Sequence, residues 1–226
     1  MAIMNPVAAT LRVEPMPAEN LLPGAPGGTF GWRLYAGNLP LALVLLSLRQ
    51  GWPLRQALAG LDDEQQARAA SLGAPGRRQE YIISRRMAQS LRAMAGSLPP
   101  RTGTWRRGIS HCRQWVGVAL SAGDALGFDI ECRAPRAVAP VAERLGWPGE
   151  WAATRSGCLH GWTAWEAWCK LRGGSVLDPP GAGYARVIDQ LGSPSRMTAR
   201  WIDANAWVAG EMEGARFCLA VRPTTR

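Results

Sequence analysis

Apolar residues alternate with polar ones or form short runs in several stretches of this chain, a pattern typical of β-strands. They predict strands at residues 32–35, 41–48, 115–120, 127–131, 184–188, 198–202, 206–211 and 215–221. The dipeptide Gly37-Asn38 predicts a turn between the first two. We expect a turn at 121–124 to join its two neighbouring strands as a hairpin, and the last four strands to form an antiparallel meander. Residues 1–31, rich in Pro, Gly and Ala, predict an irregular arm or a weakly ordered strand.

A spacing of three and four between apolar residues predicts helices at residues 65–72, 77–95, 136–145 and 158–172. An Asp N-cap precedes the first helix and Gly73 ends it, while Gly173-Gly174 ends the last. Residues 97–108 predict a loop. The order strand–helix–strands thus occurs twice. We therefore predict an α+β fold of two similar halves, residues 1–121 and 122–226, although no sequence repeat relates them.

The strand Gly127-Phe128-Asp129-Ile130-Glu131 carries the first candidate chemistry. Side chains at i and i+2 share one face of a strand, so Phe128 and Ile130 would face a core while Asp129 and Glu131 stand together opposite. Two adjacent carboxylates repel each other unless they are protonated or bridged by a cation. Oxygen ligands suit Mg²⁺, which takes carboxylates together with substrate phosphates. The alternative is an edge strand with two solvated acids.

The helix at 158–172 carries a third acid and the only lysine of the chain. Trp162, Glu166 and Lys170 are four residues apart and share one helix face. A surface Glu–Lys pair at this spacing is one interpretation, and it contributes only about 0.2–0.5 kcal/mol. Every other basic position is an arginine. A single retained lysine favours a function that needs a compact ammonium rather than a planar guanidinium.

Composition restricts the partners and the compartment. The chain has 226 residues, 47% of them apolar, a formal charge of +9 and a pI near 10.3. This charge predicts an anionic partner, whether nucleic acid, an acidic protein or a phosphate-rich small molecule. No basic helix or RNA-binding motif supports the first of these. Five cysteines without a CxxC pair and only two histidines argue against a zinc site and a disulfide framework. We expect reduced thiols, no signal peptide and a cytoplasmic protein.

Two arginines, Arg77 and Arg78, lie in the first turn of the predicted helix at 77–95. Positive charge at this end opposes the helix dipole and is mildly unfavourable for folding. The pair either binds an anion or forms a solvated basic helix end, and the sequence leaves both interpretations open.

Three stretches together resemble the 4′-phosphopantetheinyl transferase superfamily, in its larger, monomeric Sfp type. That family carries a Ser-His pair near a strand, then a Gly-x-Asp-x-Glu strand, then a Trp-[Ser/Thr]-x-Lys-Glu-[Ala/Ser]-x-x-Lys helix. Here the stretches read Ile109-Ser110-His111, Gly127-Phe128-Asp129-Ile130-Glu131 and Trp162-Thr163-Ala164-Trp165-Glu166-Ala167-Trp168-Cys169-Lys170. Their order and spacing agree with the family, and the resemblance covers about residues 60–175.

The resemblance implies transfer of 4′-phosphopantetheine from coenzyme A to a serine of an acyl or peptidyl carrier protein, with release of 3′,5′-ADP. It implies that Asp129, Glu131 and Glu166 hold Mg²⁺ against the pyrophosphate of coenzyme A. Glu166, or a water on the metal, would help to deprotonate the serine. Lys170 would contact the phosphates and stabilise the departing 3′,5′-ADP.

The resemblance also implies which residues make the other phosphate contacts with coenzyme A, and it implies a fold. Ser110 and His111 would bind its phosphates, and Arg77 and Arg78 would lie near its 3′-phosphate. The family fold has two similar α+β halves about a pseudo-twofold axis, with the site between them. The partner would be an acidic carrier protein, the enzyme a monomer, and neither nucleic acid nor a membrane would be bound.

The chain departs from the family pattern at two places. Trp165 stands where the family has its first helix lysine, and residues 97–108 lack the usual Gly-Lys-Pro segment. We expect Arg101, Arg106 or Arg107 to supply the missing phosphate contact. The alternative function is therefore a catalytically weakened relative that binds coenzyme A or a carrier protein as an accessory factor.

Overall fold

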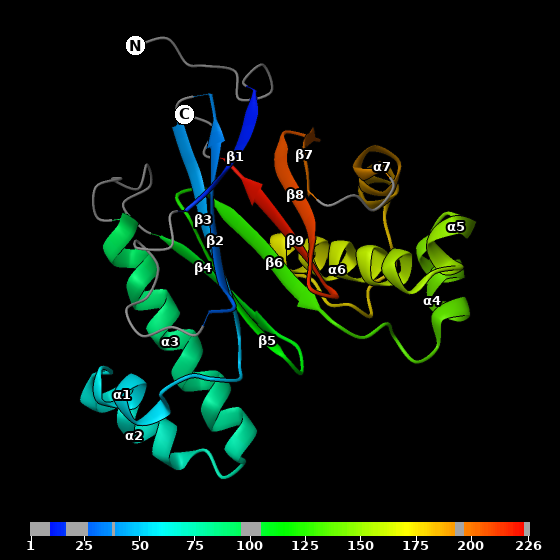
Figure 1. Cartoon of the computed structure of the whole chain (residues 1–226). Helices are drawn as coiled ribbons and strands as arrows, with labels where there is room; N and C mark the ends of the chain where they lie inside the picture. Colours follow the sequence, from blue (N-terminus) through cyan, green and yellow to red (C-terminus); the bar gives the residue numbers. More distant parts are fainter. Residues whose placement is uncertain (1–9, 17–26, 38, 96–104, 193–196, 224–226) are drawn as a thin grey trace.

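The computed structural model describes residues 10–16, 27–37, 39–95, 105–192 and 197–223 (Figure 1). The strands of this part are β1 (Leu11–Pro15), β2 (Thr29–Ala36), β3 (Leu39–Leu48), β4 (Arg106–His111), β5 (Trp115–Ser121), β6 (Ala125–Glu131), β7 (Met197–Ile202), β8 (Asn205–Met212) and β9 (Ala215–Arg222). The helices are α1 (Leu54–Ala59), α2 (Asp63–Ser71), α3 (Pro75–Ala95), α4 (Val138–Leu145), α5 (Gly149–Ala152), α6 (Arg155–Arg172) and α7 (Ala182–Leu191). No helix in these ranges combines the length and the apolar character needed to cross a membrane.

The strands form two antiparallel sheets. The first sheet has the order β1-β2-β3-β5-β4, and the second has the order β6-β9-β8-β7. All strands of the first sheet precede residue 122 and all strands of the second follow residue 124. The fold is therefore of the mixed α+β class, as predicted.

Neighbouring residues of a strand point to opposite faces of its sheet, so successive side chains belong to two different apolar clusters, one on each face. On β3, Leu43 and Leu45 pack against α1, α2 and α3, whereas Val44 and Leu46 pack against the second sheet. On β9, Phe217 and Leu219 face the first sheet, and Cys218 faces the helices that follow β6. The molecule thus has four layers, with one sheet lying on the other and helices on both outer faces (Figure 1).

The predicted helices are present with shifted ends. Asp62 caps α2, since its side chain accepts a hydrogen bond from the Gln65 backbone N–H at 2.7 Å. The helix α6 begins three residues earlier than expected and ends at Gly173, whose φ of +67° is the left-handed conformation that glycine adopts readily. Two short helices, α1 and α5, were not predicted.

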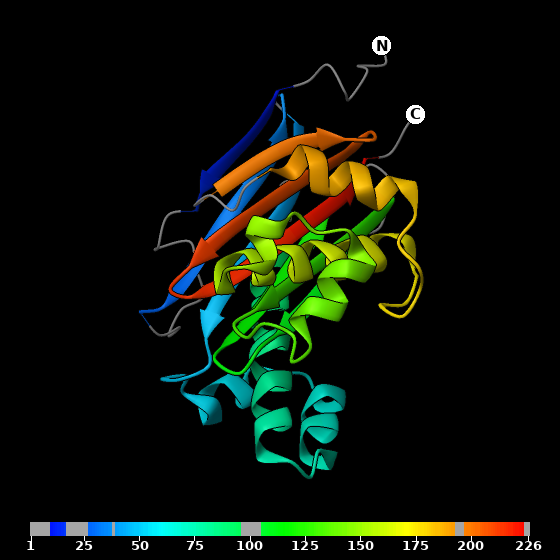
Figure 2. The ribbon, with the colours of Figure 1, turned by 90° about the vertical axis from the view of Figure 1, so that its right-hand side faces the viewer.

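The strand predicted at 184–188 is wrong, because these residues lie inside the helix α7. Tyr184, Val187, Ile188 and Leu191 are all buried against α6 and the second sheet. Their spacing of three and four residues is helical, but the five residues 184–188 alone do not distinguish a helix from a short apolar strand. Figure 2 shows α7 and α6 lying across the outer face of the second sheet. The rest of the meander, β7-β8-β9, is confirmed.

The predicted hairpin between β5 and β6 is also wrong. The strand β5 pairs with β3 and β4 in the first sheet, while β6 pairs only with β9 at the edge of the second. The three residues 122–124 carry the chain from one sheet to the other, and Phe128 and Ile130 on β6 pack between the sheets. Of the predicted loop at 97–108, residues 97–104 lie outside the described residues, and the last three belong to β4, which begins at Arg106.

Candidate functional site

The two edge strands β4 and β6 lie against each other where the sheets meet, and α6 covers β6. A Cβ atom on Gly108 of β4 would lie 2.9 Å from the Phe128 Cβ of β6. A Cβ on Gly127 of β6 would lie only 1.8 Å from the backbone oxygen of Ala167 in α6. The absence of a side chain at Gly127 therefore lets the helix approach the strand closely enough to bring their polar residues together.

Three carboxylates gather between β6 and α6. Asp129 and Glu131 come from alternate positions of β6, and Glu166 comes from α6. One oxygen of each can be chosen so that all lie within 4.8 Å of one another. Asp129 is 1% exposed, so the alternative of two solvated acids on an edge strand does not describe this site, although β6 is an edge strand.

Asp129 receives two donors on one oxygen and none on the other. Its Oδ1 accepts hydrogen bonds from Ser110 Oγ at 2.7 Å and from Lys170 Nζ at 2.6 Å. Its Oδ2 is buried and has no hydrogen-bond partner among the described residues. A buried carboxylate oxygen without a donor is costly, and a bound cation would satisfy it. The group found among the described residues offers three carboxylates, and oxygen ligands suit a hard cation such as Mg²⁺.

Lys170 contacts two of these acids. Besides the contact with Asp129, its Nζ lies 3.1 Å from Glu166 Oε2, one turn earlier on α6. A Glu–Lys pair on the helix surface accounts for the contact of Lys170 with Glu166. It does not account for the contact of Lys170 with Asp129 on β6. The remaining face of Lys170 is open, since its side chain is 38% exposed.

Burial and mutual repulsion shift the acids toward their protonated forms. Burial, opposed by the charge of Lys170 and assisted by the charge of Glu166, raises the pKa of Asp129 to about 6. Burial, then Asp129 and Glu166, raise the pKa of Glu131 to about 8. Burial opposes the charge of Lys170, but the two carboxylates outweigh it and raise the pKa of the ammonium. The acid cluster therefore lacks positive charge even with the lysine in place.

Because the acid cluster lacks compensating positive charge, we expect the stability of the protein to fall with rising pH. Bound Mg²⁺ should reduce this pH dependence. The pKa of Glu131 is higher in the folded chain than its ordinary 4.5, so its contribution is full below about pH 4.5 and is lost as the pH rises through about 8. Discounted for solvent screening, this amounts to roughly 1–2 kcal/mol, or about 2–8 °C in melting temperature. We expect Mg²⁺ to raise the melting temperature at pH 8 and to have little effect at pH 5.

The measurement is thermal unfolding with EDTA or Mg²⁺ at both pH values. Glu131→Gln should melt higher than the unchanged protein at pH 8 in EDTA and should respond weakly to Mg²⁺. Equal melting temperatures of the two proteins across the pH range would show that the Glu131 carboxylate is not destabilised by the other two acids.

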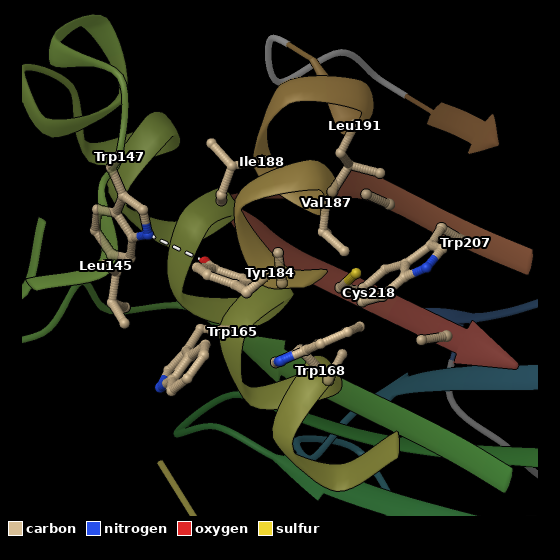
Figure 3. Packing of buried hydrophobic residues seen from close by; sticks show 14 of the residues in the cluster. Leu145, Trp147, Trp165, Trp168, Tyr184, Val187, Ile188, Leu191, Trp207 and Cys218 are labelled. Atoms are coloured by element: carbon tan, nitrogen blue, oxygen red, sulfur yellow. Dashed lines mark hydrogen bonds between the residues drawn. The ribbon is translucent and has the colours of Figure 1, made fainter. Parts of the chain in front are cut away.

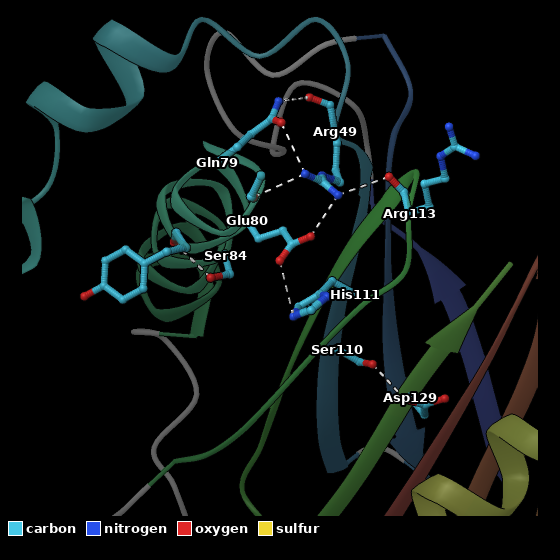
Figure 4. A network of polar contacts seen from close by, with 10 residues as sticks. Arg49, Gln79, Glu80, Ser84, Ser110, His111, Arg113 and Asp129 are labelled. Atoms are coloured by element: carbon cyan, nitrogen blue, oxygen red, sulfur yellow. Dashed lines mark hydrogen bonds and ion pairs between the residues drawn. The ribbon is translucent and has the colours of Figure 1, made fainter. Parts of the chain in front are cut away.

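Ser110 and His111 belong to two different contacts, because neighbours on a strand point to opposite sides. Ser110 is buried and reaches Asp129, while His111 faces α3 and is half exposed, with Nε2 at 3.6 Å from Glu80 Oε2 (Figure 4). Glu80 also holds Arg49 NH1 at 2.8 Å. Ser110 thus adjoins the acid cluster directly, and His111 lies one residue away on the side of α3.

The basic residues expected to bind phosphate are dispersed. Arg77 and Arg78 are exposed in the first turn of α3 and, within the described ranges, have no hydrogen bond or ion pair with the acids, Ser110 or His111. Arg106 and Arg107 lie at the opposite end of β4 from His111. Arg101 lies outside the described residues. The structure brings together Ser110, Lys170 and the three acids, and it leaves Arg77, Arg78, Arg106 and Arg107 apart from them.

Sequence reasoning missed Arg49 and Glu80, which connect the end of β3 with α3 and His111. The Arg49 guanidinium donates to the Arg113 backbone oxygen at 3.1 Å and to Gly76 O at 3.2 Å. One indication was available, since Glu80 is the single acid in the otherwise basic stretch 77–95. Nothing in the sequence indicated the role of Arg49.

Trp165, which stands where the phosphopantetheinyl transferase pattern has a lysine, belongs to the core rather than to the site. It is 1% exposed, its Nε1 donates to Val176 O at 3.1 Å, and its ring meets Tyr184 edge to face (Figure 3). Trp147 donates from Nε1 to Tyr184 Oη on the other side of this tyrosine. A lysine at position 165 would therefore have to be buried among aromatic rings, and Trp165→Lys would destabilise the fold.

The close contact at Gly127 gives a second prediction. We expect Gly127→Ala to lower the free energy of unfolding by about 2 kcal/mol, because the new methyl group would overlap the Ala167 backbone and push α6 from β6. Urea denaturation measures the loss, and the Mg²⁺-induced rise in melting temperature should shrink with it. Gly73→Ala is the matched control, since a Cβ there meets no atom within 4 Å. Equal stabilities of the two variants would contradict the prediction.

The chain was also compared with known proteins by sequence. No protein-family model matches it, and no curated protein sequence matches it.

Proposed function

We propose that this protein transfers the 4′-phosphopantetheine group of coenzyme A to a serine hydroxyl of an acyl or peptidyl carrier protein. The observation that carries the proposal is the cluster of Asp129, Glu131 and Glu166 with Lys170 on two of its members. Phosphoryl transfer needs neutralised charge and exact placement of the reactants more than covalent help from the protein. An acid cluster for a cation, with an ammonium beside it, supplies both.

The transfer forms a bond between the serine oxygen and the β-phosphorus of coenzyme A and breaks the bond from that phosphorus to the bridging oxygen of the pyrophosphate. The serine proton passes to a base, for which Glu166 is our candidate, since its carboxylate lies at the open edge of the cluster beside Lys170. The leaving group is 3′,5′-ADP. The Lys170 ammonium would neutralise the charge that develops on it.

Asp129, Glu131 and Glu166 would hold Mg²⁺, and the uncompensated Oδ2 of Asp129 fits this role. When bound, the ion supplies charge neutralisation for the pyrophosphate and the leaving oxygen. Ser110 keeps the Asp129 carboxylate in place through its hydrogen bond. The half-exposed His111, held by Glu80, would bind a phosphate of coenzyme A.

The proposal includes the two similar halves and pseudo-twofold axis of the family, with residues 1–121 and 122–226 as the halves. In support, each half contributes one antiparallel sheet with a long helix on its outer face, α3 in the first and α6 in the second. We further propose an acidic carrier protein as the partner, a monomeric enzyme and a cytoplasmic location. The charge of +9 would speed the encounter with an acidic carrier, most at low salt.

A catalytically weakened relative is the second candidate. The buried Trp165 favours it, because the site lacks one cation of the family pattern. The tryptophan side chain is uncharged and is held in the core, so it does not supply the missing charge. Such a protein would bind coenzyme A or a carrier protein without transferring the group.

Intact mass spectrometry of an apo carrier protein distinguishes the two. We expect a mass gain of one phosphopantetheine with coenzyme A and Mg²⁺, and none with EDTA. A panel of fatty-acid, polyketide and peptide carriers is needed, since the sequence does not indicate which one is used. If no carrier gains mass while calorimetry detects coenzyme A binding, the weakened relative is the correct function.

A further inference from the structure

Three arginines from three different elements line one hollow beside the acid cluster. Arg113 lies between β4 and β5, Arg133 follows β6, and Arg155 is the first residue of α6. The hollow has a volume of about 390 Å³, and its other lining residues are Gln114, Cys132 and Ala134. No acid lines it. Because Cys132 directly follows Glu131, the hollow begins one residue beyond the acid cluster.

None of these guanidinium groups forms an ion pair with an acid in the ranges that the structure describes. By contrast, Arg49, Arg186 and Arg216 each lie within ion-pair distance of a carboxylate. Arg155 donates one hydrogen bond, to Cys132 O at 2.7 Å, which fixes it over the end of β6 and leaves its other donors available. The Arg113 side chain points away from the contacts made by Arg49 (Figure 4).

The three charges are unfavourable where they stand. Like charges in one hollow repel, and Arg155 at the start of an 18-residue helix without an acid in its first turn adds to the positive end of the helix dipole. An anion would relieve both effects. Guanidinium groups bind phosphate through paired, charge-assisted hydrogen bonds, and an open hollow of this size admits a phosphate together with part of the molecule that carries it.

We infer that Arg113, Arg133 and Arg155 form a binding site for a phosphate dianion, either free or as a phosphate monoester. This site is separate from the acid cluster and does not depend on the function proposed above, because it requires neither a metal nor a transfer reaction. A neighbouring hollow of about 670 Å³ shares Arg113 and Gln114 with it and contains one acid, Glu213, so the anion belongs to the side of Arg133 and Arg155.

The test is thermal unfolding in EDTA with increasing sodium phosphate, against sodium chloride at equal ionic strength. We expect a saturable rise in melting temperature with phosphate that chloride does not produce. The double variant Arg113→Gln/Arg133→Gln, which removes no hydrogen bond of either side chain within the described chain, should weaken phosphate binding at least tenfold. Arg155→Gln alone should weaken it severalfold.

Two control variants keep the test specific. Arg68→Gln/Arg200→Gln removes the same charge from exposed positions outside the hollow and should leave phosphate binding unchanged. Asp129→Asn should also bind phosphate normally, whatever its effect on transfer. Equal weakening by both double variants, or equal effects of phosphate and chloride, would overturn the inference. Adenosine 5′-monophosphate in a parallel titration shows whether a monoester binds more tightly than the free ion through the same arginines.

Discussion

Replacing Asp129 by asparagine is expected to reduce kcat/KM of the proposed transfer by about 10²–10³-fold, equivalent to about 3–4 kcal/mol of transition-state stabilisation. The change preserves the shape of the side chain and its ability to accept from Ser110. It removes the charge on the buried oxygen that lacks a partner and so weakens the site for a cation. It also removes the charge that holds Lys170.

The rate should be measured by the mass gain of an apo carrier protein over a range of Mg²⁺ concentrations. The variant should need more Mg²⁺ for half-maximal rate and should fall short of the original rate at saturation. Asp63→Asn, an exposed acid in the first turn of α2, is the matched control and should keep full activity. If Asp129→Asn kept the original rate and the original Mg²⁺ dependence, Asp129 would not be a metal ligand.

Replacing Lys170 by methionine should have the largest effect on stability, about 3 kcal/mol at pH 8. The loss of a partner from a buried ion pair costs about 3–5 kcal/mol, and we take the lower value because Lys170 is 38% exposed. Lys170 lowers the pKa of Asp129, so its removal moves this already raised pKa further upward. A carboxyl group with a raised pKa contributes less stability as the pH rises through that value, so the loss should be small at pH 4–5 and largest at pH 8.

Urea denaturation at pH 5 and pH 8 measures this difference. Lys170→Arg is the control, because it keeps the charge and should restore most of the stability. Its transfer rate should nevertheless stay low, since a planar guanidinium does not reproduce a compact ammonium between two carboxylates. A pH-independent loss in the methionine variant would indicate lost packing rather than an uncompensated Asp129.

The sequence was sufficient where the information is local. The alternation in residues 127–131 placed Asp129 and Glu131 on one face of a strand, and the spacing of Glu166 and Lys170 placed both on one helix face. Strand and helix periodicity depend only on neighbouring residues, so these predictions needed no knowledge of the fold.

What the sequence could not predict depends on residues far apart in the chain. The turn at 121–124 looks like a hairpin turn, yet it leads from one sheet to the other, where β6 pairs with β9 and where Phe128 and Ile130 pack between the sheets. The contact of Glu80 with His111 joins a helix to a strand, and no pattern within either stretch encodes it. The arginine-lined hollow likewise combines three elements.

The lysine usage of the chain has a practical consequence for spectroscopy. Lys170 is the only lysine, and its ammonium lies between Asp129 and Glu166. Protein prepared with ¹⁵N-labelled lysine would therefore carry a single labelled side chain, located at the candidate site. A one-signal spectrum could follow the arrival of a cation or a nucleotide there without any substitution in the chain.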